Sequence, residues 1–254
     1  MFQPTEEQLM IRDLARDLAV REIGPRAAEV DESERYPEEN IRLLAEAGIL
    51  GAPFPEAYGG SDLGLMSFLM ANEEVAKVCA ATSCIIATNC LAVGCISRYG
   101  TEEQKRKYIP MGIGGQLIGF ALTEANAGSD TNGLKTKAEK DGDDYIINGT
   151  KMFITSAPVN DVHIVVTVTG TNEKGGKEFT AFIIDKGTKG FSVGKHIKKM
   201  GIRGAQTAEL ILEDVRVSAS QMLGGPGNGL KVALSSLDIG RINIGTQAMG
   251  IAQG

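Results

Sequence analysis

The sequence has few of the residues that build metal or redox centres. Its 254 residues include no tryptophan, two histidines and four cysteines, and the cysteines lie at positions 79, 84, 90 and 95. These spacings match neither a zinc-binding pair nor a redox-active pair. We therefore expect no metal site built on cysteine, and four free, buried thiols in a reducing compartment.

A basic surface and an apolar leader are also absent. The net charge of -6 and the pI near 5.1 argue against a nucleic-acid partner, because phosphate binding needs a basic face. The chain opens on a polar segment, so we expect a cytoplasmic protein. One uncharged stretch, 78–97, is long enough to cross a bilayer, but small polar residues and glycine interrupt it. We expect this stretch to be a buried helix, and no membrane segment.

The first part of the chain is patterned for helices. Thr5-Glu-Glu-Gln8 resembles a capping box in front of apolar residues at helical spacing, and Pro25 predicts a bend or stop. We expect further helices over 37–47, over 66–78, in the uncharged stretch, and from Glu102 to a stop before Pro110. The glycine- and proline-rich residues 53–65 predict a loop.

After Gly119 the apolar period changes to two, which predicts strands around Phe153 and over 162–168, 179–184 and 208–212. Asp141-Gly142 and Asn148-Gly149 are predicted hairpin turns. No G-x-G-x-x-G motif is present, so a Rossmann site is not supported. A helix returns at about Leu230 and reaches Gly254 without a capping signal, which predicts that further chain follows.

The predicted fold class is therefore α+β. We expect an N-terminal all-α helical domain over 1–118, a middle antiparallel β-barrel or sandwich domain over 119–225, and the start of a C-terminal helical bundle over 226–254.

Two segments carry the residues suited to a flavin. In the loop 120–130, Gly128 allows close approach of the backbone, and Thr123 and Ser129 offer hydroxyl groups. In the following strand, Phe153 is suited to lie against a flat ring and Thr155 to donate a hydrogen bond to it. The alternative is a glycine-rich turn beside a core phenylalanine. These residue types alone leave both interpretations open.

Four motifs add a resemblance to a known family. They are Phe120-Ala-Leu-Thr-Glu-Ala-Asn-Ala-Gly-Ser-Asp130, Gly149-Thr-Lys-Met-Phe-Ile-Thr155, Lys199-Met-Gly-Ile-Arg203 and Leu237-Asp-Ile-Gly-Arg241. In this order and spacing the chain resembles the acyl-CoA dehydrogenase family, and most of all its short-chain, butyryl-CoA-type members. The resemblance covers essentially residues 1–254.

The resemblance implies an FAD-dependent α,β-dehydrogenation of a short-chain acyl-CoA thioester to a trans-2-enoyl-CoA. Electrons would pass to an electron-transferring flavoprotein, and the full-length protein would be a homotetramer with FAD at a subunit boundary. The implied FAD contacts are Phe120, Leu122, Thr123, Gly128, Ser129, Phe153 and Thr155. The implied acyl-CoA contacts are Ser129, Asp238 and Arg241, with residues 88–93 at the base of the acyl pocket. Family members often carry tryptophan where this chain has Phe153.

Asp238 and Arg241 also have a simpler interpretation, an i,i+3 ion pair on a helix surface worth only about 0.3 kcal/mol. The resemblance favours ligand contact.

The catalytic glutamate that this family uses is missing from the sequence. No glutamate follows Asp214, and Gly240 occupies the position where a minority of members place the base. His163 and His196 are expected to be structural or solvated. We therefore expect the base beyond Gly254 and an inactive 254-residue chain. The alternatives are a non-catalytic flavin- or CoA-binding or assembly module, an enoyl-CoA reductase of the same family and, more weakly, an acyl-CoA oxidase.

Overall fold

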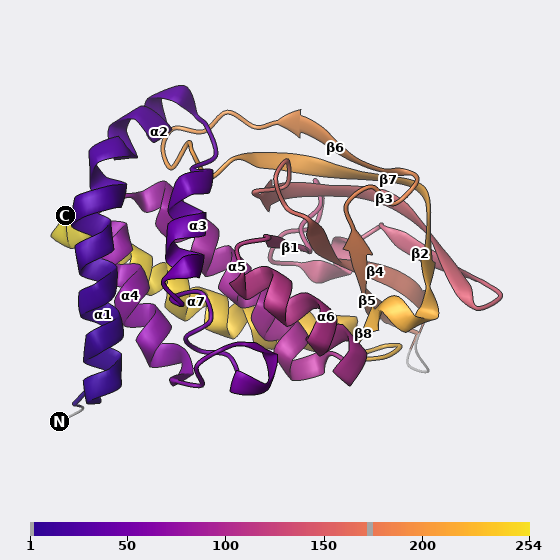
Figure 1. Cartoon of the computed structure of the whole chain (residues 1–254). Helices are drawn as coiled ribbons and strands as arrows, with labels where there is room; N and C mark the ends of the chain where they lie inside the picture. Colours follow the sequence, from indigo (N-terminus) through magenta and orange to yellow (C-terminus); the bar gives the residue numbers. More distant parts are fainter. Residues whose placement is uncertain (1–2, 172–174) are drawn as a thin grey trace.

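The computed structural model describes residues 3–171 and 175–254, and it places a helical half beside a β-sheet half (Figure 1). The helical half consists of α1 (Glu6–Leu18), the π-helical turn Ala19–Ile23, the 3-10 turn Gly24–Arg26, α2 (Ala27–Ser33), α3 (Glu38–Glu46), the 3-10 turn Glu56–Tyr58, α4 (Gly64–Val78), α5 (Ala80–Tyr99) and α6 (Glu102–Ile113).

The first helix begins where the sequence predicts. Thr5 accepts from the backbone N–H of Gln8, and the Gln8 side chain accepts from the backbone N–H of Thr5, which confirms the capping box. The chain then passes through the wider π-helical turn and the tighter 3-10 turn that contains Pro25, and it continues as α2. Pro25 therefore marks a bend.

The predicted stop of the sixth helix before Pro110 is wrong. Helix α6 runs from Glu102 to Ile113 with Pro110 inside it. Pro110 lies on an exposed face in the last turn, where water can solvate the backbone carbonyl that proline leaves without a donor. Tertiary packing of the helix outweighs the local preference of the residue before proline.

Helix α5 is the uncharged segment, and by length and composition alone it could cross a membrane. In the fold 67% of its apolar window is buried, which supports the prediction of a core helix. All four cysteines of the chain are free, and all are buried except the half-buried Cys84.

The second half is one eight-stranded sheet in the order β6-β7-β3-β2-β4-β5-β8, with β1 paired to β4. Its strands are β1 (Ile118–Ala121), β2 (Lys137–Asp141), β3 (Asp144–Thr155), β4 (Val162–Thr171), β5 (Lys177–Asp185), β6 (Phe191–His196), β7 (Thr207–Ser218) and β8 (Met222–Leu223). Most pairs are antiparallel, as predicted, but β1 and β2 each pair with β4 in parallel.

One of the two predicted hairpin turns is correct. Asp141 pairs with Asp144 across the turn that contains Gly142, whose φ is 63°. Asn148 and Gly149 instead lie inside the continuous strand β3, at a shift of register against β7. A Cβ atom on Gly149 would lie 2.7 Å from Cα of Thr136, so this glycine serves a close approach of two backbones.

Helix α7 (Gly229–Gln253) connects the two halves. It packs on α4 and α5 and reaches β5 at its N-terminal end, and Figure 1 shows it running in yellow along the helical half. The predicted helix from about Leu230 is confirmed. The domain limits given above stay a prediction.

A second connection joins α2 to the loop before β7. The carboxylate of Asp31 accepts from the backbone N–H of Arg203 at 2.9 Å and forms an ion pair with its guanidinium. The side chain of Gln206 donates to the carbonyl of Glu34 at 3.1 Å. Arg203, at the end of the motif Lys199–Arg203, and Gln206 after it therefore hold the sheet against the helical half.

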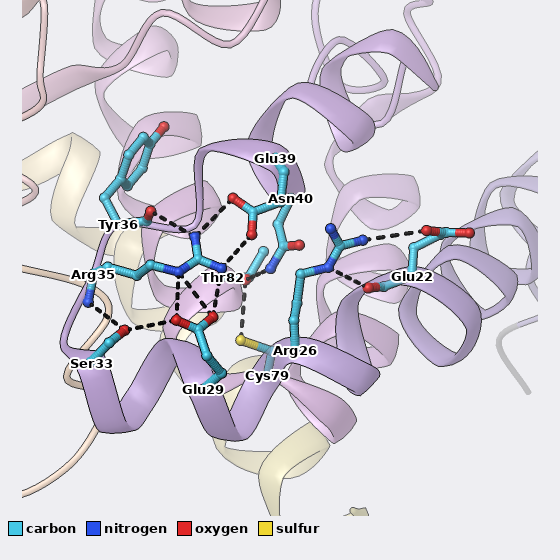
Figure 2. Close-up of polar contacts among 10 residues, drawn as sticks. All are labelled: Glu22, Arg26, Glu29, Ser33, Arg35, Tyr36, Glu39, Asn40, Cys79 and Thr82. Carbon is cyan, nitrogen blue, oxygen red and sulfur yellow. Dashed lines mark hydrogen bonds and ion pairs between the residues drawn. The ribbon is translucent and has the colours of Figure 1, made fainter.

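Arg35 fixes the corner between α2 and α3 (Figure 2). Its guanidinium contacts Glu29 at 2.7 Å and Glu39 at 2.5 Å. Next to this arginine and its two carboxylates, the buried side chain of Asn40 donates to the hydroxyl of Thr82 in α5 at 2.9 Å. The hydrogen bonds of Arg35 lower the pKa of both carboxyl groups below their ordinary value of 4.5.

These shifts predict how stability depends on acid. Below about pH 4.5 the unfolded chain binds more protons at Glu29 and Glu39 than the folded chain, so their stabilisation is lost as the pH falls through the lowered pKa values. We expect Arg35→Gln to reduce the free energy of unfolding at pH 7 and to make little difference near pH 3, as measured by urea unfolding.

Arg42→Gln is the control, because Arg42 is exposed and its nearest carboxylate contact, with Glu46, is 3.9 Å. An equal loss of stability at both pH values in Arg35→Gln would contradict the assignment.

Candidate functional site

A cavity of about 320 Å³ lies where the sheet meets α7. It is lined by Phe120, Leu122, Thr123, Gly128, Ser129, Thr131, Phe153, Ile154, Leu234, Leu237 and Arg241. Of the seven predicted flavin contacts, this cavity brings six together, and it adds Arg241 from the predicted acyl-CoA contacts. We call residues 122–136 the cradle loop, because its first half forms one wall.

Phe153 reaches the cavity because β3 is bulged. The register between β3 and β7 shifts between Lys151 and Ile154, and Phe153 has a φ of 60°. Bulges of this kind often redirect a side chain beside a functional site. Phe153 is 58% exposed, which is high for a large apolar side chain. The interpretation as a core phenylalanine is therefore wrong, and the ring is free to cover a ligand.

Thr155 is the predicted flavin contact that the structure does not bring to the cavity wall. It pairs with Thr207 at the end of β3, and its carbonyl accepts from the Asn160 side chain at 3.0 Å. Its role as a ligand contact stays a prediction.

The cradle loop has room and donors for a polar ligand. A Cβ atom on Gly128 would meet nothing within 4 Å, so the space in front of this residue is open. Within residues 3–171 and 175–254, the backbone N–H groups of Gly128 and Ser129 make no hydrogen bond. Open space, free N–H groups and an exposed ring in the same cavity fit the pyrophosphate and the flat ring of FAD.

The sequence interpretation missed a buried ion pair under this loop. Nζ of Lys151, fully buried, donates to Oε1 of Glu124 at 2.8 Å and to the carbonyl of Leu122 at 3.0 Å. Glu124 also accepts from the backbone N–H groups of Lys135 and Thr136. Both residues belong to the family motifs, Glu124 to the one over 120–130 and Lys151 to the one over 149–155. They are 27 positions apart, so no local pattern in the sequence indicates that they contact each other.

Burial and the mutual contact act in opposite directions on the pKa of each group in this pair. Burial lowers the pKa of Lys151 to about 8, although the carboxylate of Glu124 opposes the change. Burial also works to raise the pKa of Glu124, but the hydrogen bond and charge of Lys151 and the two backbone donors outweigh it and lower that pKa. The two side chains contact each other as an ion pair.

A second, apolar cavity of about 400 Å³ adjoins the first, because Leu237 and Arg241 line both. The other lining residues are Ala87, Thr88, Leu91, Gly240, Asn243 and Ile244. Thr88 and Leu91, two of the residues 88–93 that are predicted at the base of the acyl pocket, thus line this cavity. Val93 is fully buried and packs near Gly112 instead.

Asp238 and Arg241 form the simple ion pair that the sequence allows. Their closest atoms are 2.5 Å apart, and both side chains are about 70% exposed, at 72% and 68%. Arg241 also faces both cavities, whereas Asp238 lines neither within the described chain. The ion pair and a ligand-binding role for Arg241 are therefore compatible.

A catalytic base is not among the described residues that line either cavity, since these include no aspartate or glutamate. His163 is fully buried, with its ring 5.0 Å from that of Phe191, and burial lowers its pKa to about 3. His196 ends β6. Among the described residues, neither histidine lines either of these two cavities, and their expected role as structural or solvated residues stays a prediction.

The helical half, the sheet and the two adjoining cavities define an α+β protein with space for a ligand between its two halves. Comparison with known families places it further. The model of the acyl-CoA dehydrogenase N-terminal domain matches residues 5–116, and that of the middle domain matches residues 119–215. The chain belongs to the acyl-CoA dehydrogenase family, which consists of oxidoreductases.

Several curated relatives are 44% identical to the chain, and two of them are informative here. They are the short-chain-specific acyl-CoA dehydrogenase of Clostridium acetobutylicum, over 255 residues, and the acryloyl-CoA reductase (NADH) of Anaerotignum propionicum, over 256 residues. Each alignment covers 100% of this chain but only 67% and 65% of the relative. The chain thus spans about two thirds of the length of these relatives.

Solved structures agree with the fold. Butyryl-CoA dehydrogenase from Megasphaera elsdenii superposes with a TM-score of 0.94 at 40% identity, over 100% of this chain and 67% of that one. An acyl-CoA dehydrogenase from Bacillus anthracis complexed with FAD gives a TM-score of 0.90 at 34% identity, over 98% of this chain and 44% of that one. The predicted family and fold class are confirmed.

Proposed function

We propose that the protein takes part in FAD-dependent α,β-dehydrogenation of a short-chain acyl-CoA thioester. The observation that carries this proposal is the meeting of two cavities at Leu237 and Arg241. The first is walled by the cradle loop and Phe153, as a flavin requires. The second is apolar and walled by α5 and α7, as a short acyl chain requires.

FAD, when bound, would accept the hydride from the β-carbon while a base removes the α-proton. Phe153 would cover the ring, and the N–H groups of Gly128 and Ser129 would bind phosphate oxygens. Arg241 would hold a polar part of the acyl-CoA at the junction. The apolar lining by Leu91, Leu237 and Ile244 would exclude water from the reacting carbons.

The base would come from a carboxylate outside the cavity linings described here. Removal of an α-proton needs a base within hydrogen-bond reach of the substrate, and the described walls supply none. We accordingly propose that the 254-residue chain by itself binds the cofactor and the acyl-CoA but does not catalyse the dehydrogenation.

The partners follow from the family resemblance. Electrons would pass to an electron-transferring flavoprotein, and the protein would act as a homotetramer in the cytoplasm. Pull-down with an electron-transferring flavoprotein and light scattering would test the first two points.

The deciding experiment is a visible absorption spectrum of the chain with added FAD, before and after anaerobic addition of butyryl-CoA. The same measurement on the protein extended through its reading frame serves as the comparison. We expect FAD binding in both and bleaching of the flavin band only in the extended protein. Failure of both proteins to bind FAD would leave the alternative of a non-catalytic module.

Arg241→Gln should separate ligand binding from folding. Because the ion pair of Arg241 with Asp238 is exposed, we expect almost no change in unfolding midpoint. Loss of a charged contact to the ligand should weaken butyryl-CoA binding about tenfold or more, as measured by calorimetry on the FAD-loaded protein. Arg216→Gln is the control, because Arg216 is 54% exposed in an ion pair elsewhere on the sheet. Unchanged butyryl-CoA affinity in Arg241→Gln would remove Arg241 from the site.

Enoyl-CoA reduction is the second candidate, because one 44% identical relative is named an acryloyl-CoA reductase. The cavities suit either direction, since both reactions hold the same acyl chain against the same cofactor. Rates measured on the extended protein with butyryl-CoA, and with crotonyl-CoA plus a reduced electron donor, would distinguish them.

A further inference from the structure

The feature that the proposed function leaves unused is the buried pair of Glu124 and Lys151 beneath the cradle loop. Its energetics call for an explanation, because a buried ion pair loses hydration and is often no more stabilising than apolar residues of the same volume. Lys151 is fully buried and Glu124 is 9% exposed, so this cost applies to both.

The contacts of the pair fix both ends of the wall. At its start, Lys151 holds the carbonyl of Leu122 at 3.0 Å. At its end, the carboxylate of Glu124 accepts from the backbone N–H of Lys135 at 2.7 Å and from that of Thr136 at 3.0 Å. The residues that face the cavity, including Gly128 and Ser129, lie between these fixed points.

The same pair also connects the cradle loop to the part of β3 that carries Phe153. Lys151 stands two residues before Phe153, and between them the backbone N–H of Met152 donates to the carbonyl of Thr123 at 2.8 Å. The bulge that exposes Phe153 begins directly after Lys151. One buried ammonium group therefore links the wall that carries the free N–H groups to the wall that carries the ring.

We propose that Glu124 and Lys151 are positioning residues that set the distance and orientation of the cradle loop relative to Phe153. The proposal rests on the proposed function in one respect, that the ligand held between these walls is FAD. The pair touches no cavity space itself, so it acts through the loop and not as a catalytic group.

The test is the double variant Glu124→Gln/Lys151→Met, which removes both buried charges at nearly constant volume and leaves the carbonyl of Leu122 without its donor. The matched control is Arg16→Met/Glu74→Gln. This pair also has a buried carboxylate, at 3.0 Å, but it joins α1 to α4 in the helical half.

Three quantities are compared with the unmodified chain: amide hydrogen exchange without ligand, FAD affinity by titration, and the visible spectrum of bound flavin. In the test variant we expect faster exchange confined to residues 122–136 and about tenfold or more weaker FAD binding, because a loop that is no longer held in place must be ordered when the ligand binds. We also expect a shifted flavin band. The control should keep all three at the values of the unmodified chain.

Unchanged exchange over 122–136, or faster exchange with unchanged FAD affinity and spectrum, would overturn the proposal. If the unmodified chain does not bind FAD at all, the proposal that this chain by itself holds the cofactor fails, and exchange alone decides whether the pair orders the loop. Should the double variant not fold, Lys151→Arg keeps the charge but moves the donor, and the same exchange pattern and weaker binding are expected. Wild-type behaviour of Lys151→Arg would then count against the proposal.

Discussion

Replacing Lys151 alone by methionine is expected to lower the free energy of unfolding by about 3 to 5 kcal/mol. The variant leaves Glu124, 9% exposed, as a buried carboxylate without its cation. Two backbone N–H groups still contact it, but they do not neutralise the charge. The loss is measured by urea unfolding at pH 7 with unchanged m-value.

The matched control for this prediction is Lys107→Met. Lys107 also contacts a carboxylate at 2.8 Å, that of Asp185, but the two side chains are 50% and 41% exposed. Exposed pairs contribute at most about 1 kcal/mol, so a much smaller loss is expected. Equal losses in the two variants would mean that water reaches Glu124 and that the pair is not desolvated.

Gly229→Ala is expected to disturb the site without touching it. A Cβ atom on Gly229 would lie 2.6 to 2.7 Å from three backbone atoms of Thr180, and a backbone has no rotamer with which to yield. Helix α7 must therefore move away from β5. Because α7 carries Leu237 and Arg241, both cavities should change shape. We expect a loss of about 1 to 3 kcal/mol in stability and weaker FAD binding.

Gly245→Ala provides the control on the same helix. A Cβ atom on Gly245 would meet nothing within 4 Å, and alanine favours a helix over glycine by about 0.5 to 1 kcal/mol. This variant should be slightly more stable and should bind FAD normally. If Gly229→Ala also binds FAD normally, the position of α7 against β5 does not control the cavity.

Local signals in the sequence predicted most of the elements. Thr5 and Gln8 predict the start of α1, and Asp141-Gly142 predicts the turn between β2 and β3. Each of these depends on residues within a few positions of one another, so the chemistry is visible in the sequence. The local signals failed at Pro110 and at Asn148-Gly149, where contacts with distant residues decide the conformation.

The candidate site divides in the same way. The motifs placed six of the seven expected flavin contacts around one cavity, because each motif is a short, continuous stretch of the wall. The sequence did not predict that Lys151 contacts Glu124, or that Phe153 is exposed on a bulge with a φ of 60°. It also did not predict that Thr155 would stay off the cavity wall.

By itself, then, the sequence determined the family, the order and type of the elements, and the residues suited to a flavin and an acyl-CoA. Only the tertiary structure decided how those residues meet. Arg241 lines the same cavity as the cradle loop because α7 packs against β5. Lys151 is buried where β3 contacts the cradle loop, through the hydrogen bonds of Lys151 to Leu122 and Glu124. The physical reason is that such contacts join residues far apart in the chain, and packing across that separation leaves no periodic or local trace in the sequence.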